Sequence, residues 1–235
     1  LMDAIYFQID KFYNKNDNTE EIWSIVKSIV WIVDNNWSKP DKGIWEFRKE
    51  DKHFTFSKLL SWVAVDRAIK ISNMIGKKEK TKKWVKLRNE IRKEILNKGW
   101  NNKIKAFSQS YGSDELDASV LLMESYDFIN ASDKRYISTV KAIEKELMSN
   151  GLLYRYKNND DFGRPTSSFT VCTFWYINSL FKIGETEKSR ELFNEVLGYS
   201  NHLGLFSEDI DFNSKRLLGN FPQAYSHLAL IECAL

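Results

Sequence analysis

Residues 43–48 read Gly43-Ile44-Trp45-Glu46-Phe47-Arg48 and set a carboxylate between two aromatic side chains. A second carboxylate follows an aromatic residue far along the chain, in Phe206-Ser207-Glu208-Asp209. Neither stretch continues the apolar spacing of its neighbours, so we expect both in loops between helices. Two carboxylates on separate loops suit hydrolysis of a glycosidic bond, which needs one protonated acid and one ionised base. Glu46 and Glu208 therefore form the first functional hypothesis.

Apolar residues recur at spacings of three and four around these loops, with almost no strict alternation, which predicts an all-α fold. Gly76 and Gly184 separate adjoining helices, because glycine readily ends a helix in the left-handed conformation. Asp114 and Asp133 are expected to open first turns, as acidic residues do at helix starts. The expected helices lie at about residues 1–14, 20–36, 55–75, 78–98, 114–127, 133–149, 168–183, 185–199 and 220–235.

The connections between these helices alternate between short and long. If consecutive helices run antiparallel, all the long loops lie at one end of the bundle, where function usually resides. Helical hairpins that repeat in this way bury their apolar faces on their neighbours, as a solenoid or a closed ring. The long connections are about 37–54, 99–113, 150–167 and 200–219.

Composition limits the class of protein. The chain has 235 residues, of which 43% are hydrophobic, so it can bury a large core as one domain. Lysine and arginine number 35 against 32 acidic residues, a net charge of +3 spread along the chain. Only residues 77–83 are densely basic, and a solvated helix face explains them better than a nucleic-acid site. Four tryptophans on apolar helical faces are expected in the core: Trp23, Trp31, Trp62 and Trp84.

Metal, redox and membrane chemistry find little support in the sequence. Cys172 and Cys233 both sit in apolar runs, so we expect buried free thiols. The histidines are far apart and have no ligand-spaced partners, and no glycine-rich phosphate loop occurs, so no metal or cofactor is expected. No apolar run reaches the roughly 18 residues that span a bilayer, and no secretory signal opens the chain. We therefore expect a cytoplasmic protein with no membrane partner.

Several short motifs are spread over nearly the whole chain. They are Gly43-Ile44-Trp45-Glu46 with His53-Phe54-Thr55 and Ser57-Lys58, then Gln109-Ser110-Tyr111-Gly112-Ser113 with Leu116-Asp117-Ala118-Ser119, then Gly151-Leu152-Leu153-Tyr154-Arg155-Tyr156, then Leu205-Phe206-Ser207-Glu208, and last Leu218-Gly219-Asn220-Phe221-Pro222-Gln223-Ala224-Tyr225-Ser226-His227. Together these motifs resemble the catalytic domain of family 15 glycoside hydrolases, the group of glucoamylases, glucodextranases and microbial trehalases.

The resemblance implies an (α/α)6 barrel of twelve helices in two rings, with the active site at one end. Counting back from Glu208, which should lie between the eleventh and twelfth helices, Leu1 falls near the fourth. We therefore expect a single domain over residues 1–235 that holds about nine of the twelve helices, the C-terminal three-quarters of the barrel. The first helices and the β-sandwich domain that often precedes the barrel would be absent.

The resemblance also implies an inverting reaction with Glu46 as general acid and Glu208 as general base. A glucoamylase-like release of β-glucose from non-reducing ends of α-glucosides is the first expectation, with trehalase as the alternative. The aromatic neighbours Trp45 and Phe47 would favour the protonated form of the acid. Fungal glucoamylases carry a second glutamate at the position of Phe47. The family's Trp-Pro-Arg-Asp type segment, which grips the terminal glucose, does not occur here.

Four further residues are candidates for substrate binding. Arg155 aligns with an arginine that contacts sugar hydroxyls in the family, although a surface ion pair would also explain it. Trp45 would stack on a pyranose face or pack within the protein. Lys58, with His53, would orient the acid loop or donate to substrate, or would only be a polar residue at a helix start. Gln223 opens the last helix behind the base loop, where a supporting role competes with helix capping.

Other readings remain open. Asp209 and Asp211 compete with Glu208 but are expected to shape its loop, and Phe169 would border the sugar pocket. The rival class is a non-catalytic carbohydrate-binding or scaffold remnant. A third reading is a terpene-cyclase-like toroid, but the sequence lacks the aspartate-rich metal motifs that this chemistry needs. The expected partner is an oligosaccharide or disaccharide α-glucoside, and exposed helix edges would favour self-association or contact with a missing N-terminal segment.

Overall fold

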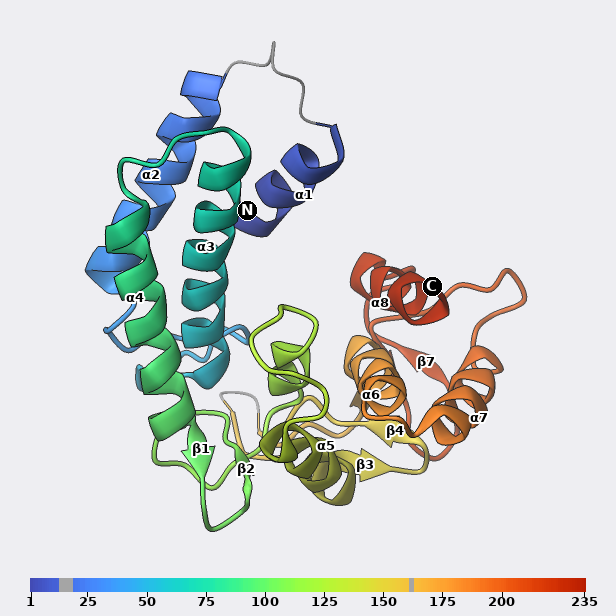
Figure 1. The fold of residues 1–235 in the computed structure, drawn as a ribbon. Coiled ribbons are helices and arrows are strands. Elements are labelled where there is room, and N and C mark those ends of the chain that lie inside the picture. The colour runs from blue at the N-terminus through green and yellow to red at the C-terminus, as the bar shows by residue number, and fades with distance from the viewer. Residues whose placement is uncertain (13–18, 161–162) are drawn as a thin grey trace. The chain divides into compact units, whose positions relative to one another are not determined.

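The computed structural model describes residues 1–12, 19–160 and 163–235 (Figure 1). Backbone contacts divide the chain into two units, Leu1–Gly99 and Trp100–Leu235, and each unit is described by itself. The single-domain expectation for residues 1–235 stays a prediction. No helix among the described residues is long and apolar enough to cross a membrane.

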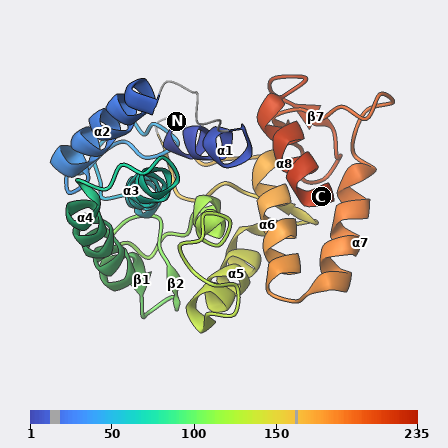
Figure 2. The same cartoon turned by 45° about the horizontal axis from the view of Figure 1, so that its top comes forward.

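The first unit is built around one central helix. Its elements are α1 (Met2–Phe12), α2 (Thr19–Asn36), α3 (Thr55–Met74), α4 (Thr81–Glu94) and a single π-helical turn, η1 (Ile95–Gly99). Helix α3 contacts α1, α2 and α4, and Figure 2 shows it end-on between them. A helix surrounded in this way is buried on most sides, which explains why α3 has no strong apolar stripe.

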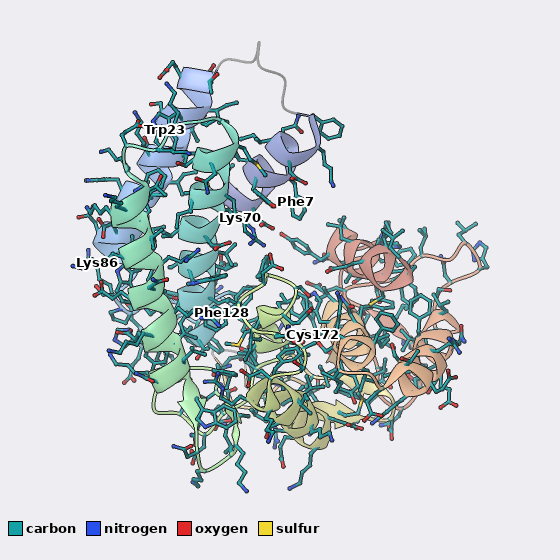
Figure 3. The ribbon with its side chains drawn as sticks, in the orientation of Figure 1. Phe7, Trp23, Lys70, Lys86, Phe128 and Cys172 are labelled. Atoms are coloured by element: carbon teal, nitrogen blue, oxygen red, sulfur yellow. The ribbon has the colours of Figure 1, made fainter. Side chains whose placement is uncertain are left out.

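Helices α2 and α4 show the apolar spacing that the sequence predicts. Trp23 and Val26 are buried on α2, and Trp84 and Leu87 are buried on α4. The rings of Trp23 and Trp84 lie 5.1 Å apart, and Figure 3 labels Trp23 on its helix. Trp62 is buried as expected, but the expectation for Trp31 is wrong, because its side chain is 68% exposed. Trp31 follows buried Val30 by one position, about 100° around the helix, and so lies to the side of the buried stripe.

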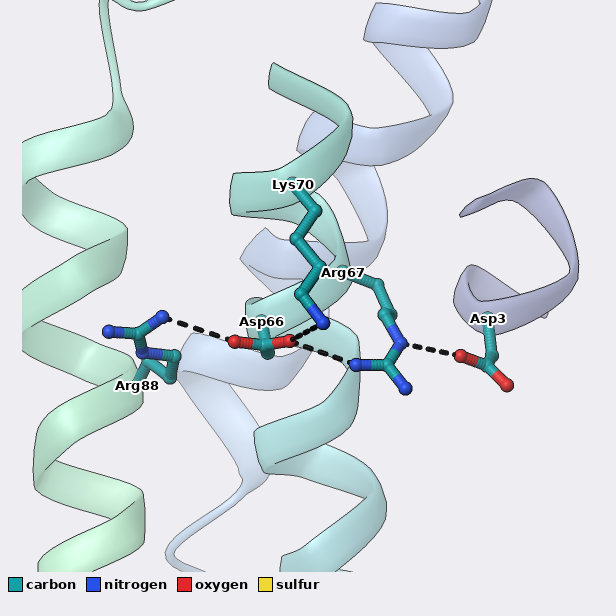
Figure 4. Close-up of polar contacts among 5 residues, drawn as sticks. All are labelled: Asp3, Asp66, Arg67, Lys70 and Arg88. Carbon is teal, nitrogen blue, oxygen red and sulfur yellow. Dashed lines mark hydrogen bonds and ion pairs between the residues drawn. The ribbon is translucent and has the colours of Figure 1, made fainter. Parts of the chain in front are cut away.

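A buried ionic network joins three helices of the first unit (Figure 4). The carboxylate of Asp66 on α3 accepts from Arg67 at 3.0 Å and from Arg88 on α4 at 3.1 Å. Lys70 lies 3.2 Å from the same carboxylate. Arg67 also donates to Asp3 on α1 at 2.7 Å. Because Asp66 and Arg67 are both buried, each charge depends on these partners for stabilisation.

The second unit carries its long loops on short antiparallel ladders. Its helices are the 3-10 helix η2 (Ala118–Met123), α5 (Lys134–Leu147), α6 (Thr170–Lys182), α7 (Thr186–Leu197) and α8 (Ala224–Ala234). Its strands, of two residues each, are β1 (Trp100–Asn101), β2 (Ala106–Phe107), β3 (Met148–Ser149), β4 (Leu152–Leu153), β5 (Ser168–Phe169), β6 (Asp209–Ile210) and β7 (Leu217–Leu218). Helix α6 is the centre of this unit and contacts α5, α7 and α8.

Two long connections of the second unit are joined through the backbone. Strand β6 lies between β5 and β7, with Phe169 opposite Asp209. The N–H of Thr170 donates to the carbonyl of Glu208, and the N–H of Ala118, at the start of η2, donates to the carbonyl of Arg155. The chain leading into β5 and the connection that holds β6 and β7 therefore meet, while the gathering of all the long connections stays a prediction. The remaining long connection, residues 37–54, belongs to the first unit.

Most expected helices are present within four residues of their predicted limits, although the expected end at residue 14 lies outside the described residues. The helix expected over residues 114–127 is wrong. Only Ala118–Met123 is helical there, as a 3-10 helix. Its start is set by Asp117, whose backbone is extended and whose carboxylate accepts from Ser119 N–H at 2.8 Å and from Gln109 at 3.0 Å. Such local side-chain bonds compete with α-helix formation. Asp133, expected in the first turn of α5, lies one residue earlier as its N-cap and accepts from Arg135 N–H at 2.8 Å.

Candidate active site

The loop that carries Glu46 is closed at its base by backbone and side-chain hydrogen bonds. Asp41 and Lys52 exchange both of their backbone hydrogen bonds at 2.9 Å. The carboxylate of Asp41 also accepts from the N–H of Gly43 at 2.6 Å and from the hydroxyl of Ser57 at 2.7 Å. Residues 41–52 therefore form a closed loop tied to the first turn of α3.

Glu46 lies at the tip of this loop in a backbone conformation that is rare for its type. Its φ is +54°, in the left-handed region, and its N–H donates to the Gly43 carbonyl at 3.2 Å. Its side chain is exposed. A non-glycine residue in this region often marks a functional site, because the surrounding structure must hold it there. The loop thus presents the Glu46 carboxylate outward.

Aromatic packing fixes the two sides of the loop. The rings of Phe47 and Phe54 are stacked, with centroids 5.3 Å apart and planes inclined by 2°. A Cβ added to Gly43 would lie 2.9 Å from Cγ of Phe54, so only glycine fits against that ring. Phe47 therefore packs against the loop itself, and Trp45 beside it is half-buried.

Lys58 holds the chain just ahead of this loop. Its side chain is buried and its ammonium donates to the carbonyls of Trp37, at 2.6 Å, and of Lys39. Burial lowers the pKa of Lys58, and the charge of Asp41 opposes that shift. The ammonium thus ties the end of α2 to the start of α3. Both roles expected of Lys58, orienting the acid loop and donating to substrate, stay predictions.

Glu208 lies in the long connection 200–219 of the second unit, directly before β6. We call this connection the base loop, after the role expected of Glu208. Its N–H donates to the carbonyl of Asn220 at 2.9 Å. Its carboxylate accepts from the backbone N–H of Asn220 at 3.2 Å and from the side-chain amide at 2.9 Å. The same carboxylate lies over Gly219, where an added Cβ would come within 2.8 Å of Oε2. These contacts hold the Glu208 carboxylate in one position, against Asn220 and Gly219.

Gln223 and His227 close the other side of the base loop. The N–H of Gln223 donates to the carbonyl of Phe206 at 3.0 Å. His227 Nε2 accepts from the N–H of Phe206 at 3.2 Å, so its Nδ1 carries the proton and donates to the Gln223 carbonyl at 2.7 Å. Ser226 adds a hydrogen bond to the carbonyl of Ser207 at 2.8 Å. The backbone of Gln223 therefore supports the loop, and contact of its side chain with substrate stays a prediction.

Arg155 lies between aromatic rings and a buried carboxylate. Its guanidinium is 5.1 Å from the ring centre of Tyr156 and 5.8 Å from that of Phe169. It lies 3.4 Å from Asp160, which also accepts from the Tyr156 hydroxyl at 2.7 Å. Arg155, Asp160, Phe169 and Asp209 border a cavity of about 230 Å³. Arg155 is thus part of a pocket wall, which suits the sugar-binding role expected of it.

Asp209 and Asp211 differ in what their side chains do. Asp211 accepts from the backbone N–H groups of Asn213 at 3.1 Å and Ser214 at 2.7 Å, and these bonds lower its pKa. It shapes the turn, as expected. Asp209 accepts from the hydroxyl of Ser167 at 2.5 Å, and burial, with a contribution from the charge of Glu208, raises its pKa.

The structure adds residues that the sequence does not single out. Asp160, Ser167 and Asn220 each bond to a candidate site residue, and all three come from loops without regular periodicity. Only the motif context of Asn220, in the last family motif, gives a signal. Phe169 lines the cavity beside Arg155, and its expected place at a sugar pocket stays a prediction. Among the described residues, no cluster of three or more histidine, cysteine, aspartate or glutamate side chains is arranged to hold a metal ion.

The chain matches the family described as glycosyl hydrolases family 15 over residues 2–235. The chain therefore belongs to this family. It is 42% identical over 214 residues to a trehalase of Thermoplasma volcanium, a match that covers 91% of this chain and 34% of that protein. It is 36% identical over 238 residues to a trehalase of Mycolicibacterium smegmatis, covering 100% of this chain and 35% of that protein. The chain thus spans about a third of the length of these curated relatives.

Solved structures support the fold class. The glucoamylase of Saccharomycopsis fibuligera superimposes with a TM-score of 0.79 at 12% identity, covering 99% of this chain and 67% of that one. A bacterial glucoamylase solved with acarbose gives a TM-score of 0.77 at 12% identity, covering 99% and 39%. The predicted fold class, an all-α chain that makes up part of an (α/α)6 barrel, is therefore confirmed.

Proposed function

We propose that the protein is an inverting glycosidase, with Glu46 as general acid and Glu208 as general base, and that its substrate is α,α-trehalose. The observation that carries the reaction is the fixing of Glu208, which lies over Gly219 and accepts two N–H groups of Asn220. Those contacts fix the position of the carboxylate that would activate water. The exposed, strained position of Glu46 suits a group that meets substrate at the loop tip.

The proposed reaction breaks one bond between an anomeric carbon and the glycosidic oxygen. Glu46 gives its proton to that oxygen, which leaves with the second glucose. Glu208 takes a proton from a water molecule whose oxygen bonds to the anomeric carbon from the opposite face. After each turnover Glu46 is ionised and Glu208 is protonated, and exchange with solvent restores both. The carboxyl groups of an inverting pair lie about 6.5–9.5 Å apart, with the water between them.

The relatives favour trehalose over longer α-glucans. The curated proteins at 36% and 42% identity are trehalases, whereas the glucoamylase structures, at 12% identity, share only the fold. The glucoamylase-like specificity expected from sequence motifs therefore becomes the second candidate. In both cases Arg155 would hold sugar hydroxyls, while Trp45 would offer a ring face to a pyranose.

Matched substitutions test this assignment. In the full-length protein, Glu46→Gln and Glu208→Gln should each lower kcat for trehalose about 10²–10⁴-fold, the usual contribution of a general acid or base. Asp211→Asn is the control, because Asp211 only shapes a turn three residues away. Turnover near that of the unsubstituted protein in either glutamine variant would contradict the assignment. If the unsubstituted protein released no glucose from trehalose or maltose, the non-catalytic alternative would replace it.

A further inference from the structure

The cavity of about 230 Å³ beside β6 contains a carboxylate with no assigned role. Asp209 follows Glu208 directly, and both the cavity and Asp209 belong to the second unit. The wall also includes Arg155, Ser167 and Phe169. Strand pairing places Phe169 directly opposite Asp209, so their side chains are neighbours across the ladder.

The side chain of Asp209 is not needed to build the loop that carries it. Its backbone is already paired on both sides, to Phe169 on β5 and to Leu218 on β7. Asp211, two residues on, uses its carboxylate to accept two backbone N–H groups of the turn. The carboxylate of Asp209 instead accepts one hydroxyl, from Ser167. An ionised carboxylate has about four acceptor positions, so Asp209 has capacity for donors from a ligand.

The chemistry of the cavity selects a neutral, hydroxyl-rich ligand. The guanidinium of Arg155 supplies donors, the carboxylate of Asp209 supplies acceptors, and the ring of Phe169 supplies an apolar face. The wall carries two arginines, Arg155 and Arg164, and two carboxylates, Asp160 and Asp209, so its charges balance and favour a neutral ligand over an anion such as phosphate. The permanent charge of Arg155 would disfavour a metal cation. A pyranose ring, with hydroxyls around its edge and C–H groups on its faces, matches all three features.

We propose that Asp209 is a sugar-binding residue, which accepts hydrogen bonds from the hydroxyls of one hexopyranose seated against Arg155 and Phe169. The inference rests on the proposed function and deepens it. It makes Asp209, which sequence reasoning treats as a loop-shaping residue, a substrate-binding residue that directly follows Glu208 in the sequence.

The test measures binding in the absence of turnover. Dissociation constants for trehalose and for D-glucose are measured by titration calorimetry on full-length Glu208→Gln protein, and on the same protein with Asp209→Asn or Asp211→Asn added. Losing hydrogen bonds to a charged group should weaken binding about tenfold or more in the Asp209 variant. The Asp211 variant should stay within about twofold. A value for Asp209→Asn within about twofold of its parent would overturn the proposal.

A second variant covers the case in which Asp209→Asn disturbs folding, which near-ultraviolet circular dichroism would reveal. Ser167→Ala keeps the carboxylate but removes the hydroxyl that orients it, so binding should weaken about threefold. Unchanged binding in that variant would contradict the proposal. Failure of the proposed function has a different signature, namely no cleavage of trehalose by the unsubstituted protein, and glucose binding would still decide the role of Asp209.

Discussion

Replacing Gly219 with alanine tests whether the backbone beneath Glu208 positions the base. Gly219 has a φ of +75°, and an added Cβ would lie 2.8 Å from Oε2 of Glu208, where ordinary contact begins at 3.4 Å. The carboxylate would have to move by about 0.6 Å, away from the amide of Asn220 that holds it. Displacements approaching 1 Å in a reacting group can cost about a hundredfold in rate. We therefore expect kcat to fall about ten- to a hundredfold.

The same substitution also costs stability through the backbone, which a matched control removes from the comparison. Gly204 lies in the same loop with a φ of +73°, and nothing lies within 4 Å of its added Cβ. Both Gly219→Ala and Gly204→Ala should lose about 1–2 kcal/mol of unfolding free energy from the left-handed conformation. Initial rates on trehalose and thermal unfolding curves are measured for both. Equal losses of kcat in the two variants would refute the positioning role of Gly219.

Three further outcomes are expected. Asp66→Ala should lower the free energy of unfolding by about 3–5 kcal/mol, because buried Arg67 loses one of its carboxylate partners. Lys83→Ala, at an exposed pair, should cost at most about 1 kcal/mol, and similar values for the two variants in urea denaturation would contradict this. Gly43→Ala should lower the free energy of unfolding by about 1–3 kcal/mol more than Gly76→Ala, because only the Cβ added at Gly43 would meet an aromatic ring, that of Phe54. Equal melting temperatures of the two variants would contradict this. Burial raises the pKa of Asp209 in the folded protein above its usual 3.8, so ionisation of this carboxyl group disfavours folding. As pH rises from about 3.8 through the raised pKa, the wild type should therefore lose stability relative to Asp209→Asn. A pH-independent difference in melting temperature between the two proteins would disprove this.

The helical frame is largely predictable from apolar spacing, because burial of one face dictates that spacing. Trp23 and Trp84 meet across α2 and α4 as the pattern requires. The error over residues 114–127 has a local cause. Apolar residues there have helical spacing, but Asp117 bonds its own neighbour and Gln109, and the chain takes a short 3-10 helix. Apolar spacing carries no information about whether such side-chain hydrogen bonds will replace the backbone hydrogen bonds of an α-helix. Trp31 shows the converse limit, since an apolar residue on a helix can still be exposed.

The motifs predict which loops carry the candidate site, but not how the side chains are held. These side chains are held by residues that are close in space but separated along the chain. Lys58 contacts two backbone carbonyls, and Glu208 contacts Asn220 and Gly219. Asp209 and Asp211 look alike in sequence, and only the pairing of β6 with its neighbours separates their roles. These distinctions depend on loop conformation, for which periodicity carries no signal.

The most direct test of the account is the anomeric composition of glucose released at early times from α,α-trehalose, followed by proton NMR with the full-length protein. Inversion at one anomeric carbon produces one β-glucose, while the leaving glucose keeps its α configuration. The account predicts equal initial α and β signals, and their loss in Glu208→Gln. Release of α-glucose alone would show retention and would contradict the assignment of Glu208 as a base that activates water.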